Sequence, residues 1–181
     1  ERKRVFIEIV LFRFVTIFLS TIVYYFFFMR RNQYQIYYQI LLLELIAAAF
    51  DISWFFQGME EFKRTVTRNV LVRVCSVTAV FLFVKNKEDL ALFTLIYSIG
   101  DLLGNLSLWL YLPKYFKGIK VKNINILKHS TAILLLFIPQ IADQIYNMLD
   151  KTMIGNMLAD KTEVGYYEQA QKVIRILLTI V

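Results

Sequence analysis

Long apolar stretches separated by short polar connections run through the whole chain. A transmembrane helix needs about 20 mostly apolar residues, and six stretches approach this length. Open strands cannot satisfy their backbone hydrogen bonds in lipid, and no apolar–polar alternation with a period of two is visible, so helices are predicted. We therefore expect an all-α integral membrane protein with about six transmembrane helices. The expected spans are residues 5–28, 36–56, 69–84, 90–112, 127–149 and 164–181.

The composition agrees with a membrane protein and excludes most soluble classes. Of the 181 residues, 58% are hydrophobic and 19% are charged, whereas soluble domains average about 45–50% and about 25%. A single cysteine, Cys75, excludes an intrachain disulfide. The short connections leave no room for a soluble domain.

The basic residues predict the orientation in the membrane. The net charge is +7, and the connections 1–4, 57–68 and 113–128 hold eleven Lys and Arg residues against six in the other connections. Cytoplasmic loops are enriched in Lys and Arg, so these three connections and the N-terminus are expected in the cytoplasm. The positive charge therefore requires no nucleic-acid partner.

Charged residues inside the expected spans are the first candidates for function. They are the cations Arg13 and Arg73 and the acids Glu44, Asp101 and Asp143. A charge at the centre of a membrane helix costs about 2.5–3.5 kcal/mol or more, so it usually faces a bundle interior or a water-filled cavity. Two interpretations remain open: the charges line a cavity, or they form ion pairs between helices. The two arginines also lie near enough to helix ends to extend toward the interface.

The fifth span adds a polar stripe. Gln140, Asp143, Asn147 and Asp150 follow helical spacing and share one face. Pro139 removes a backbone hydrogen bond and predicts a kink or break beside this stripe. Transporters build substrate and ion sites beside broken helices.

Other patterns indicate packing rather than chemistry. Gly100 and Gly104 are four residues apart and permit close approach of another helix, with Asp101 pointing elsewhere. No enzyme, cofactor or metal-binding motif is present, so we expect no enzyme, no cofactor and no metal site. The single histidine, His129, is expected to be a solvated interfacial residue.

Two stretches resemble the bacterial oligosaccharide flippases of polysaccharide biosynthesis, in the superfamily that includes multidrug extruders and lipid II flippases. The first is FDISWFFQGMEEF at 50–62, followed by Arg68 and Asn69. The second is LDKTMIG at 149–155, followed by EVGYYEQA at 163–170. The resemblance covers the whole chain. The family-motif residues are Asp51, Trp54, Gln57, Gly58, Asp150, Lys151, Gly155, Gly165, Tyr166 and Tyr167.

The resemblance implies a domain organisation. Members of the family have about twelve or more spans in two bundles around a central cavity, so this chain is expected to be an internal piece of such a protein. Residues 1–112 would belong to the first bundle, 113–128 would be a basic cytoplasmic linker, and 129–181 would begin the second bundle. Composition alone favours an ordinary interfacial loop for 113–128, and it is the resemblance that favours the linker instead.

The resemblance also implies a function: moving an undecaprenyl-diphosphate-linked oligosaccharide across the bacterial cytoplasmic membrane. Arg13 and Arg73 are then candidates for binding the diphosphate, and Gln140 and Asn147 for binding the sugars. The acids Glu44, Asp101 and Asp143 are candidates for coupling to H⁺ or Na⁺. Expected partners are the lipid-linked oligosaccharide, membrane lipid and the coupling ion.

Two alternatives remain. A cation-coupled multidrug exporter of the same superfamily should have acids and aromatic residues in its cavity and few cations. A membrane-embedded glycosyltransferase or polymerase should have a catalytic carboxylate pair on a long loop, and no connection here is long enough for one.

Overall fold

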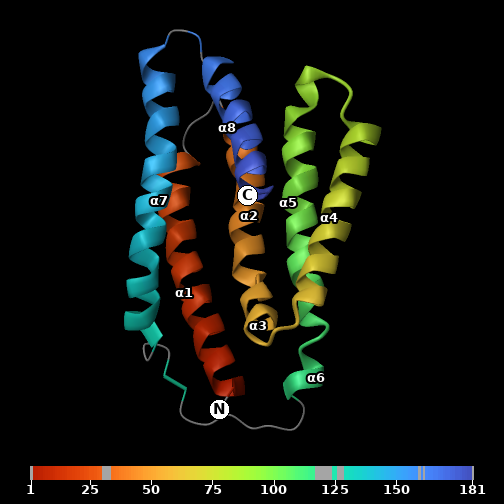
Figure 1. Ribbon diagram of the computed structural model, residues 1–181, viewed down its shortest axis with the longest axis vertical. Coiled ribbons are helices and arrows are strands. Elements are labelled where there is room, and N and C mark those ends of the chain that lie inside the picture. Colours follow the sequence, from red (N-terminus) through yellow and green to blue (C-terminus); the bar gives the residue numbers. More distant parts are fainter. Residues whose placement is uncertain are drawn as a thin grey trace. The chain divides into compact units, whose positions relative to one another are not determined.

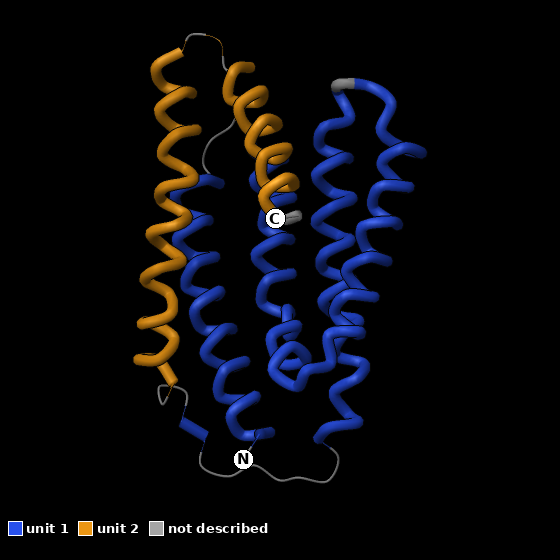
Figure 2. The backbone as a smooth tube through the Cα atoms, viewed as in Figure 1, with its two compact units in different colours: residues 1–128 blue, residues 129–181 orange. Residues whose placement is uncertain are grey.

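The computed structural model describes residues 2–29, 34–116, 124–125, 129–158, 160 and 162–180, and these residues form helices and connections without a strand. The chain divides into two compact units, Glu1–Lys128 and His129–Val181 (Figure 2). Each unit is described by itself below.

Unit 1 contains four long helices and several short ones. The long helices are α1 (Arg2–Phe28), α2 (Gln35–Phe50), α4 (Phe62–Phe83) and α5 (Leu90–Trp109). The short ones are α3 (Ser53–Gly58), η2 (Lys87–Asp89) and α6 (Pro113–Phe116). Helix α2 packs against α1 and α5, and α5 also packs against α4, which gives the lateral order α1, α2, α5, α4 (Figure 1).

Five helical segments of the described residues are long and apolar enough to cross a membrane. They are Arg2–Phe28, Gln35–Gly58, Phe62–Phe83, Leu90–Phe116 and Ser130–Met157. The expected all-α membrane fold is therefore confirmed. The sixth expected span is helical as α8 (Thr162–Ile180), but with four charged side chains it is not among these five segments.

The helices differ from the expected spans in two details. Helix α4 begins at Phe62 rather than at residue 69, so Arg68 lies within the helix and not in the preceding connection. The expected span 36–56 agrees with the membrane-crossing segment Gln35–Gly58, within which α2 ends at Phe50 and α3 begins at Ser53. This break was not predicted from the sequence.

The close approach of α4 and α5 depends on two glycines. A Cβ atom at Gly104 would lie 2.7 Å from Val72 Cγ2, and one at Gly100 would lie 2.6 Å from Ser76 Oγ. A larger residue at either position requires a shift of an α4 side chain or of α4 itself, so the predicted packing role of both glycines is confirmed. Asp101 faces a different side of α5, where it lines a polar pocket.

The best-packed part of unit 1 is an aromatic cluster that joins α1, α3, α5 and α6. Phe6 stacks on Trp54 at a ring separation of 5.6 Å and meets Phe55 edge to face at 5.0 Å. Phe116 lies 5.1 Å from Phe6 and 5.4 Å from Phe55. This cluster lies at the end of the unit that contains the start of α1, α3 and α6 (Figure 1).

The opposite end of unit 1 includes the turn between α4 and α5. The backbone N–H groups of Asn86 and Lys85 donate to the Asp89 carboxylate at 2.9 Å each. These hydrogen bonds stabilise the ionised form and hold the pKa of the Asp89 carboxyl below its usual value. The turn is therefore held by an anionic side chain that stays ionised at neutral pH.

Unit 2 is a helical hairpin of α7 (Ser130–Met157) and α8. Helix α7 continues through Pro139, so the break that the sequence allowed at this position does not occur. Two contacts join the helices through family-motif residues: Tyr167 Oη donates to Asp150 Oδ2 at 2.8 Å, and Lys151 Nζ lies 3.7 Å from Glu168 Oε1.

Candidate functional site

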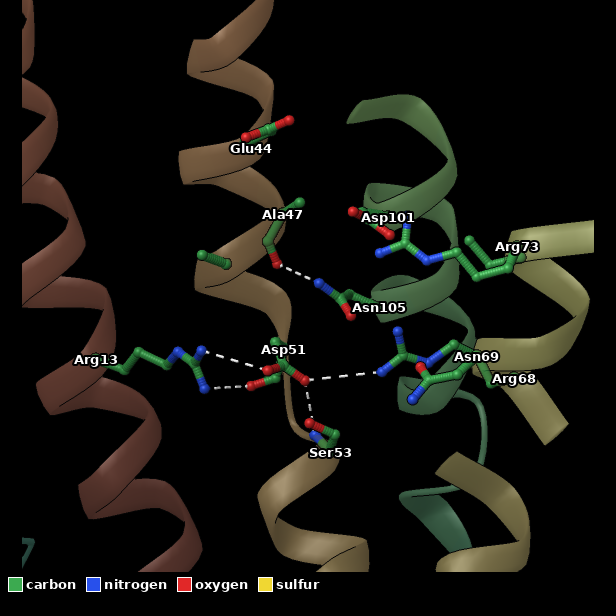
Figure 3. A pocket seen from close by; sticks show the side chains of 12 residues that line it. Arg13, Glu44, Ala47, Asp51, Ser53, Arg68, Asn69, Arg73, Asp101 and Asn105 are labelled. Atoms are coloured by element: carbon green, nitrogen blue, oxygen red, sulfur yellow. Dashed lines mark hydrogen bonds and ion pairs between the residues drawn. The ribbon is translucent and has the colours of Figure 1, made fainter. Parts of the chain in front are cut away.

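A polar pocket of about 560 Å³ lies among the four long helices of unit 1 (Figure 3). Residues from α1, α2, α4, α5 and the α2–α3 junction line it, and half of them are charged. They are Arg13, Glu44, Ala47, Ala48, Asp51, Ser53, Arg68, Asn69, Val72, Arg73, Asp101 and Asn105. Three arginines and three carboxylates thus meet within segments that are long and apolar enough to span a membrane.

Asp51 lies at the break between α2 and α3 and contacts two of the arginines. Arg13 Nη1 donates to the Asp51 carbonyl oxygen at 2.6 Å, and Arg13 Nη2 lies 3.5 Å from Asp51 Oδ2. Arg68 Nη2 lies 3.9 Å from Asp51 Oδ1, which also accepts a hydrogen bond from the Ser53 N–H at 2.9 Å. Figure 3 shows Arg13 and Arg68 approaching Asp51 from opposite sides.

The break in α2 leaves backbone carbonyls without helical partners, and side chains from other helices bind them. Asn105 Nδ2 on α5 donates to the Ala47 carbonyl at 2.7 Å, and Trp109 Nε1 donates to the Phe50 carbonyl at 2.7 Å. Together with Arg13, these donors replace the bonds that a continuing helix would make. In a membrane such replacement is required, because no water satisfies a free carbonyl in the hydrocarbon core.

Arg73 is the pocket arginine that contacts an aromatic ring instead of Asp51. Its guanidinium carbon lies 5.7 Å from the ring centroid of Tyr97, at cation–π distance. Among the described residues it has no ion pair within 4 Å, although Asp101 lines the same pocket. Figure 3 shows the Arg73 side chain extending from α4 toward α5. Its donors are therefore the most accessible to an anionic ligand.

Two acids complete the pocket. Glu44 Oε1 on α2 accepts a hydrogen bond from Ser98 Oγ at 3.3 Å. Asp101 on α5 has no ion pair among the residues that the structure describes. Glu44 and Asp101 thus line the pocket without forming an ion pair with its arginines. Asp51, in contrast, pairs with two of them.

The structure brings together four of the residues singled out from the sequence. Arg13, Arg73, Glu44 and Asp101 come from four helices and line one pocket. Asp51, singled out as a motif residue, lines it too. The sequence left open whether the charges line a cavity or form ion pairs between helices. The structure shows both, since Arg13 lines the pocket and also pairs with Asp51.

Sequence reasoning missed Arg68, Asn69 and Asn105 as pocket residues. Arg68 was assigned to a cytoplasmic connection because the helix start was placed too late. With α4 beginning at Phe62, Arg68, Asn69 and Arg73 lie within about a turn and a half of one another, and that spacing is the signal that would have found them. Asn105 follows Asp101 by one turn on α5, a second usable signal.

The candidates of unit 2 lie on α7. Asn147 Nδ2 donates to the Asp143 carbonyl at 2.7 Å, and Asn147 Oδ1 accepts from Arg175 Nη2 at 2.8 Å. The Asp143 side chain is exposed within this unit, and Gln140 lines a separate, mostly apolar groove along α7. Of the polar stripe, Asn147 and Asp150 therefore contact α8, whereas Gln140 and Asp143 are exposed within unit 2.

The remaining family-motif residues lie outside the charged pocket. Trp54 belongs to the aromatic cluster, while Gln57 and Gly58 are exposed at the end of α3. A Cβ at Gly155 would lie 3.4 Å from Val164 Cγ2 at the α7–α8 turn. The last two positions, Gly165 and Tyr166, are open: nothing lies within 4 Å of a Cβ at Gly165, and Tyr166 is 69% exposed.

These features define a multi-pass membrane protein with a charged pocket between its helices. The model of one family, described as polysaccharide biosynthesis protein, matches residues 2–181. The chain belongs to this family, whose members are generally transporters of the bacterial cell membrane. Neither the comparison with curated proteins nor that with solved structures found a match.

Proposed function

We propose that the protein flips an undecaprenyl-diphosphate-linked oligosaccharide from the cytoplasmic to the outer leaflet. The family membership supports a flippase or transporter in polysaccharide synthesis. The observation that supports this particular substrate is the pocket of unit 1, where Arg13, Arg68 and Arg73 meet between apolar helices.

The arginines suit a diphosphate. A guanidinium stays charged in a membrane pocket and donates paired hydrogen bonds to phosphate oxygens. Arg13 and Arg68 already contact one anion, the Asp51 carboxylate, and Arg73 has no ion pair among the described residues. A diphosphate entering the pocket would bind Arg73 first and then compete with Asp51 for the other two.

Hydrogen-bonding groups for sugars lie beside the arginines. Asn69 and Ser53 line the pocket, and a sugar hydroxyl both donates and accepts hydrogen bonds with such side chains. Gln140 and Asn147 of unit 2 remain candidates for the same role, with substrate reaching them as the two bundles of the family rock around a central site.

Ion coupling is assigned to the acids. Glu44 and Asp101 line the pocket without an arginine within 4 Å among the described residues, so each is available to take up H⁺ or to bind Na⁺. Asp143 is the corresponding candidate on α7. Uptake of a cation near the diphosphate would offset its charge during passage through the membrane.

The pocket composition disfavours a multidrug exporter. A site for organic cations should contain carboxylates and aromatic rings with few positive groups. Here three arginines line the pocket and Tyr97 is engaged by Arg73. Three carboxylates balance these arginines in formal charge, but a site with three arginines does not match what an exporter of organic cations should contain.

The test is transport of lipid-linked oligosaccharide in proteoliposomes. Arg73→Ala is expected to lower the flipping rate at least about ten-fold, since loss of one charged hydrogen-bond donor to phosphate costs about 1.5–3 kcal/mol. Arg73→Lys, which keeps the charge, should retain more activity.

A matched control is Lys85→Ala, which removes a cation from the α4–α5 turn, away from the pocket. Its flipping rate should equal that of the unchanged protein. Normal flipping in Arg73→Ala, or transport of organic cations in place of lipid-linked sugar, would contradict the proposal.

A further inference from the structure

A buried carboxylate near the start of α1 lies outside the charged pocket. Glu8 is only 1% exposed, within a segment that is long and apolar enough to span a membrane. Its Oε1 atom accepts a hydrogen bond from Arg4 Nε at 2.9 Å. Burying a carboxylate is costly unless it is paired and hydrogen-bonded, so the partners of Glu8 indicate what this side chain does.

Another partner of Glu8 comes from the connection between the two units. The backbone N–H of Asn125 donates to the same Oε1 atom at 2.9 Å, across 117 positions in sequence. Asn125 belongs to unit 1, whereas unit 2 begins at His129. A hydrogen bond to a charged acceptor is stronger than one between neutral groups, so this contact is suited to hold the connection on α1.

The first turns of α1 also bind the beginning of this connection. Lys3 Nζ donates to the Phe116 carbonyl oxygen at 3.3 Å. The ring of Phe116 lies 5.1 Å from that of Phe6 in the aromatic cluster. Helix α1 therefore binds the chain where α6 ends and binds it again at Asn125, shortly before unit 2.

The contact at Asn125 shortens the tether between the units. With Asn125 bound, the four residues from there to His129 span at most about 14 Å, at about 3.6 Å per residue. With Asn125 released and Phe116 still bound, the tether spans at most about 47 Å. Release at Asn125 therefore raises the reach of the tether about three-fold.

Helix α1 joins this contact to the charged pocket. Arg13 lies five residues after Glu8, lines the pocket and pairs with Asp51. The two positions are about 7.5 Å apart along one continuous helix. A shift of α1 on ligand binding at Arg13 therefore acts on Glu8 as well, and the coupling is reciprocal.

We propose that Glu8 is a positioning residue that holds the connection on α1 and thereby controls alternating access. We call the hydrogen bond between Glu8 and the Asn125 N–H the linker latch. This inference rests on the proposed function and adds its regulation. The closed latch restricts movement of unit 2 and favours one access state, and the open latch permits the other. Flipping needs both states, so the latch opens and closes in each cycle.

Spin labels on either side of the latch test the proposal. In a Cys75→Ala background, nitroxides are attached at Lys114→Cys in α6 and Thr131→Cys at the start of α7, both exposed positions. Double electron–electron resonance on the full-length protein in nanodiscs measures the distances between them. Glu8→Leu should broaden the distribution and add a longer component, because leucine suits a buried position and accepts no hydrogen bond.

Two further variants keep the test independent of the loss of one buried side chain. Glu8→Gln keeps an oxygen that accepts from the Asn125 N–H, so its distribution should stay close to that of the unchanged protein. Asn125→Pro removes the donor N–H and leaves α1 unaltered, so it should reproduce the effect of Glu8→Leu. Hydrogen exchange of the Asn125 amide should be at least about ten-fold faster in Glu8→Leu than in the unchanged protein.

Transport in proteoliposomes connects the latch to function. Glu8→Leu and Asn125→Pro should flip lipid-linked oligosaccharide more slowly than Glu8→Gln, since loss of the latch shifts the population toward one access state. Equal distance distributions in the three variants would overturn the latch and leave the proposed function standing. A longer component with an unchanged flipping rate would overturn its control of alternating access. No flipping by the unchanged protein would overturn the proposed function and this control together.

Discussion

The carboxylate of Asp51 accepts a hydrogen bond from the Ser53 N–H and lies between Arg13 and Arg68. It therefore has two separable roles. The hydrogen bond to Ser53 helps α3 begin directly after α2 ends, as Asp side chains do in turns. The negative charge neutralises two arginines that a diphosphate would otherwise bind.

Asp51→Asn separates these roles, since Asn keeps an oxygen for Ser53 and removes the charge. We expect inorganic diphosphate to bind about two- to five-fold more tightly, which corresponds to about 0.5–1 kcal/mol for a partly exposed ion pair. Titration calorimetry in detergent measures this. Glu61→Gln, an acid that does not line the pocket, is the control. Weaker binding by Asp51→Asn would mean that its charge does not compete with phosphate.

Asp143 is the residue of unit 2 whose ionisation is open to test. Its side chain is exposed within the hairpin and has no ion pair among the described residues. We expect Asp143→Asn to reduce flipping driven by an imposed H⁺ or Na⁺ gradient and to leave the melting temperature unchanged. Proteoliposome transport and a thermal melt give the two readouts. An unchanged gradient-driven rate rules out coupling, and a large loss of melting temperature indicates a static ion pair instead.

At the scale of helices, a helix can end inside a membrane segment where side chains of other elements bind its free backbone carbonyls. Helix α2 ends where Arg13, Asn105 and Trp109 donate to its last carbonyls and to that of Asp51. Pro139 removes one N–H from α7, and the helix continues through it. Proline is tolerated in membrane helices, so this residue alone is a weak predictor of a break.

Gly104 tests the contact between α4 and α5. Gly104→Ala places a methyl group 2.7 Å from Val72 Cγ2 and 3.2 Å from Arg68 Cδ, so the Val72 side chain or α4 itself must shift. We expect a loss of about 1–3 kcal/mol in the free energy of unfolding, measured as a lower melting temperature in detergent.

Gly58→Ala is the matched control, because a Cβ there has nothing within 4 Å. Replacing this helical glycine should leave stability unchanged or raise it by up to about 1 kcal/mol. A similar destabilisation in both variants would mean that loss of glycine flexibility, rather than helix contact, controls stability.

At the scale of the whole molecule, the orientation in the membrane remains a prediction. The starts of α1 and α4 and the segment of α6 lie at one end of unit 1, and the α4–α5 turn lies at the other (Figure 1). This alternation agrees with placing residues 113–128 in the cytoplasm and residues 85–89 outside.

Cysteine labelling in a Cys75→Ala background checks the orientation. A membrane-impermeant maleimide added to intact cells should label Glu88→Cys and leave Lys114→Cys unlabelled. After permeabilisation, both positions should react. Labelling of Lys114→Cys from outside would reverse the orientation, and with it the proposed direction of transport.

The organisation into two bundles joined by a cytoplasmic linker also remains a prediction. The two compact units, Glu1–Lys128 and His129–Val181, meet in sequence where the expected linker ends. Most of the linker lies outside the described residues. Unit 1 contains a pocket formed by its own four helices, so the chemistry proposed for that pocket does not depend on how the units are arranged.

The sequence by itself determined the class of protein, the approximate spans and the family. These properties depend on contiguous residues, since a membrane span is a run of apolar residues and each family motif lies within a short segment. The sequence also identified Arg13, Arg73, Glu44 and Asp101 as unusual, because a charge in an apolar run is costly wherever the helix lies.

Only the tertiary structure decided that these four residues share one pocket with Arg68 and Asp51. The carbonyls that end α2 are bound by side chains 38, 58 and 59 positions away in sequence. Local propensity contains no information about such partners. The break after α2 and the meeting of three arginines in one pocket arise from how separate helices pack, because only packing determines which backbone and side-chain groups are left without a partner.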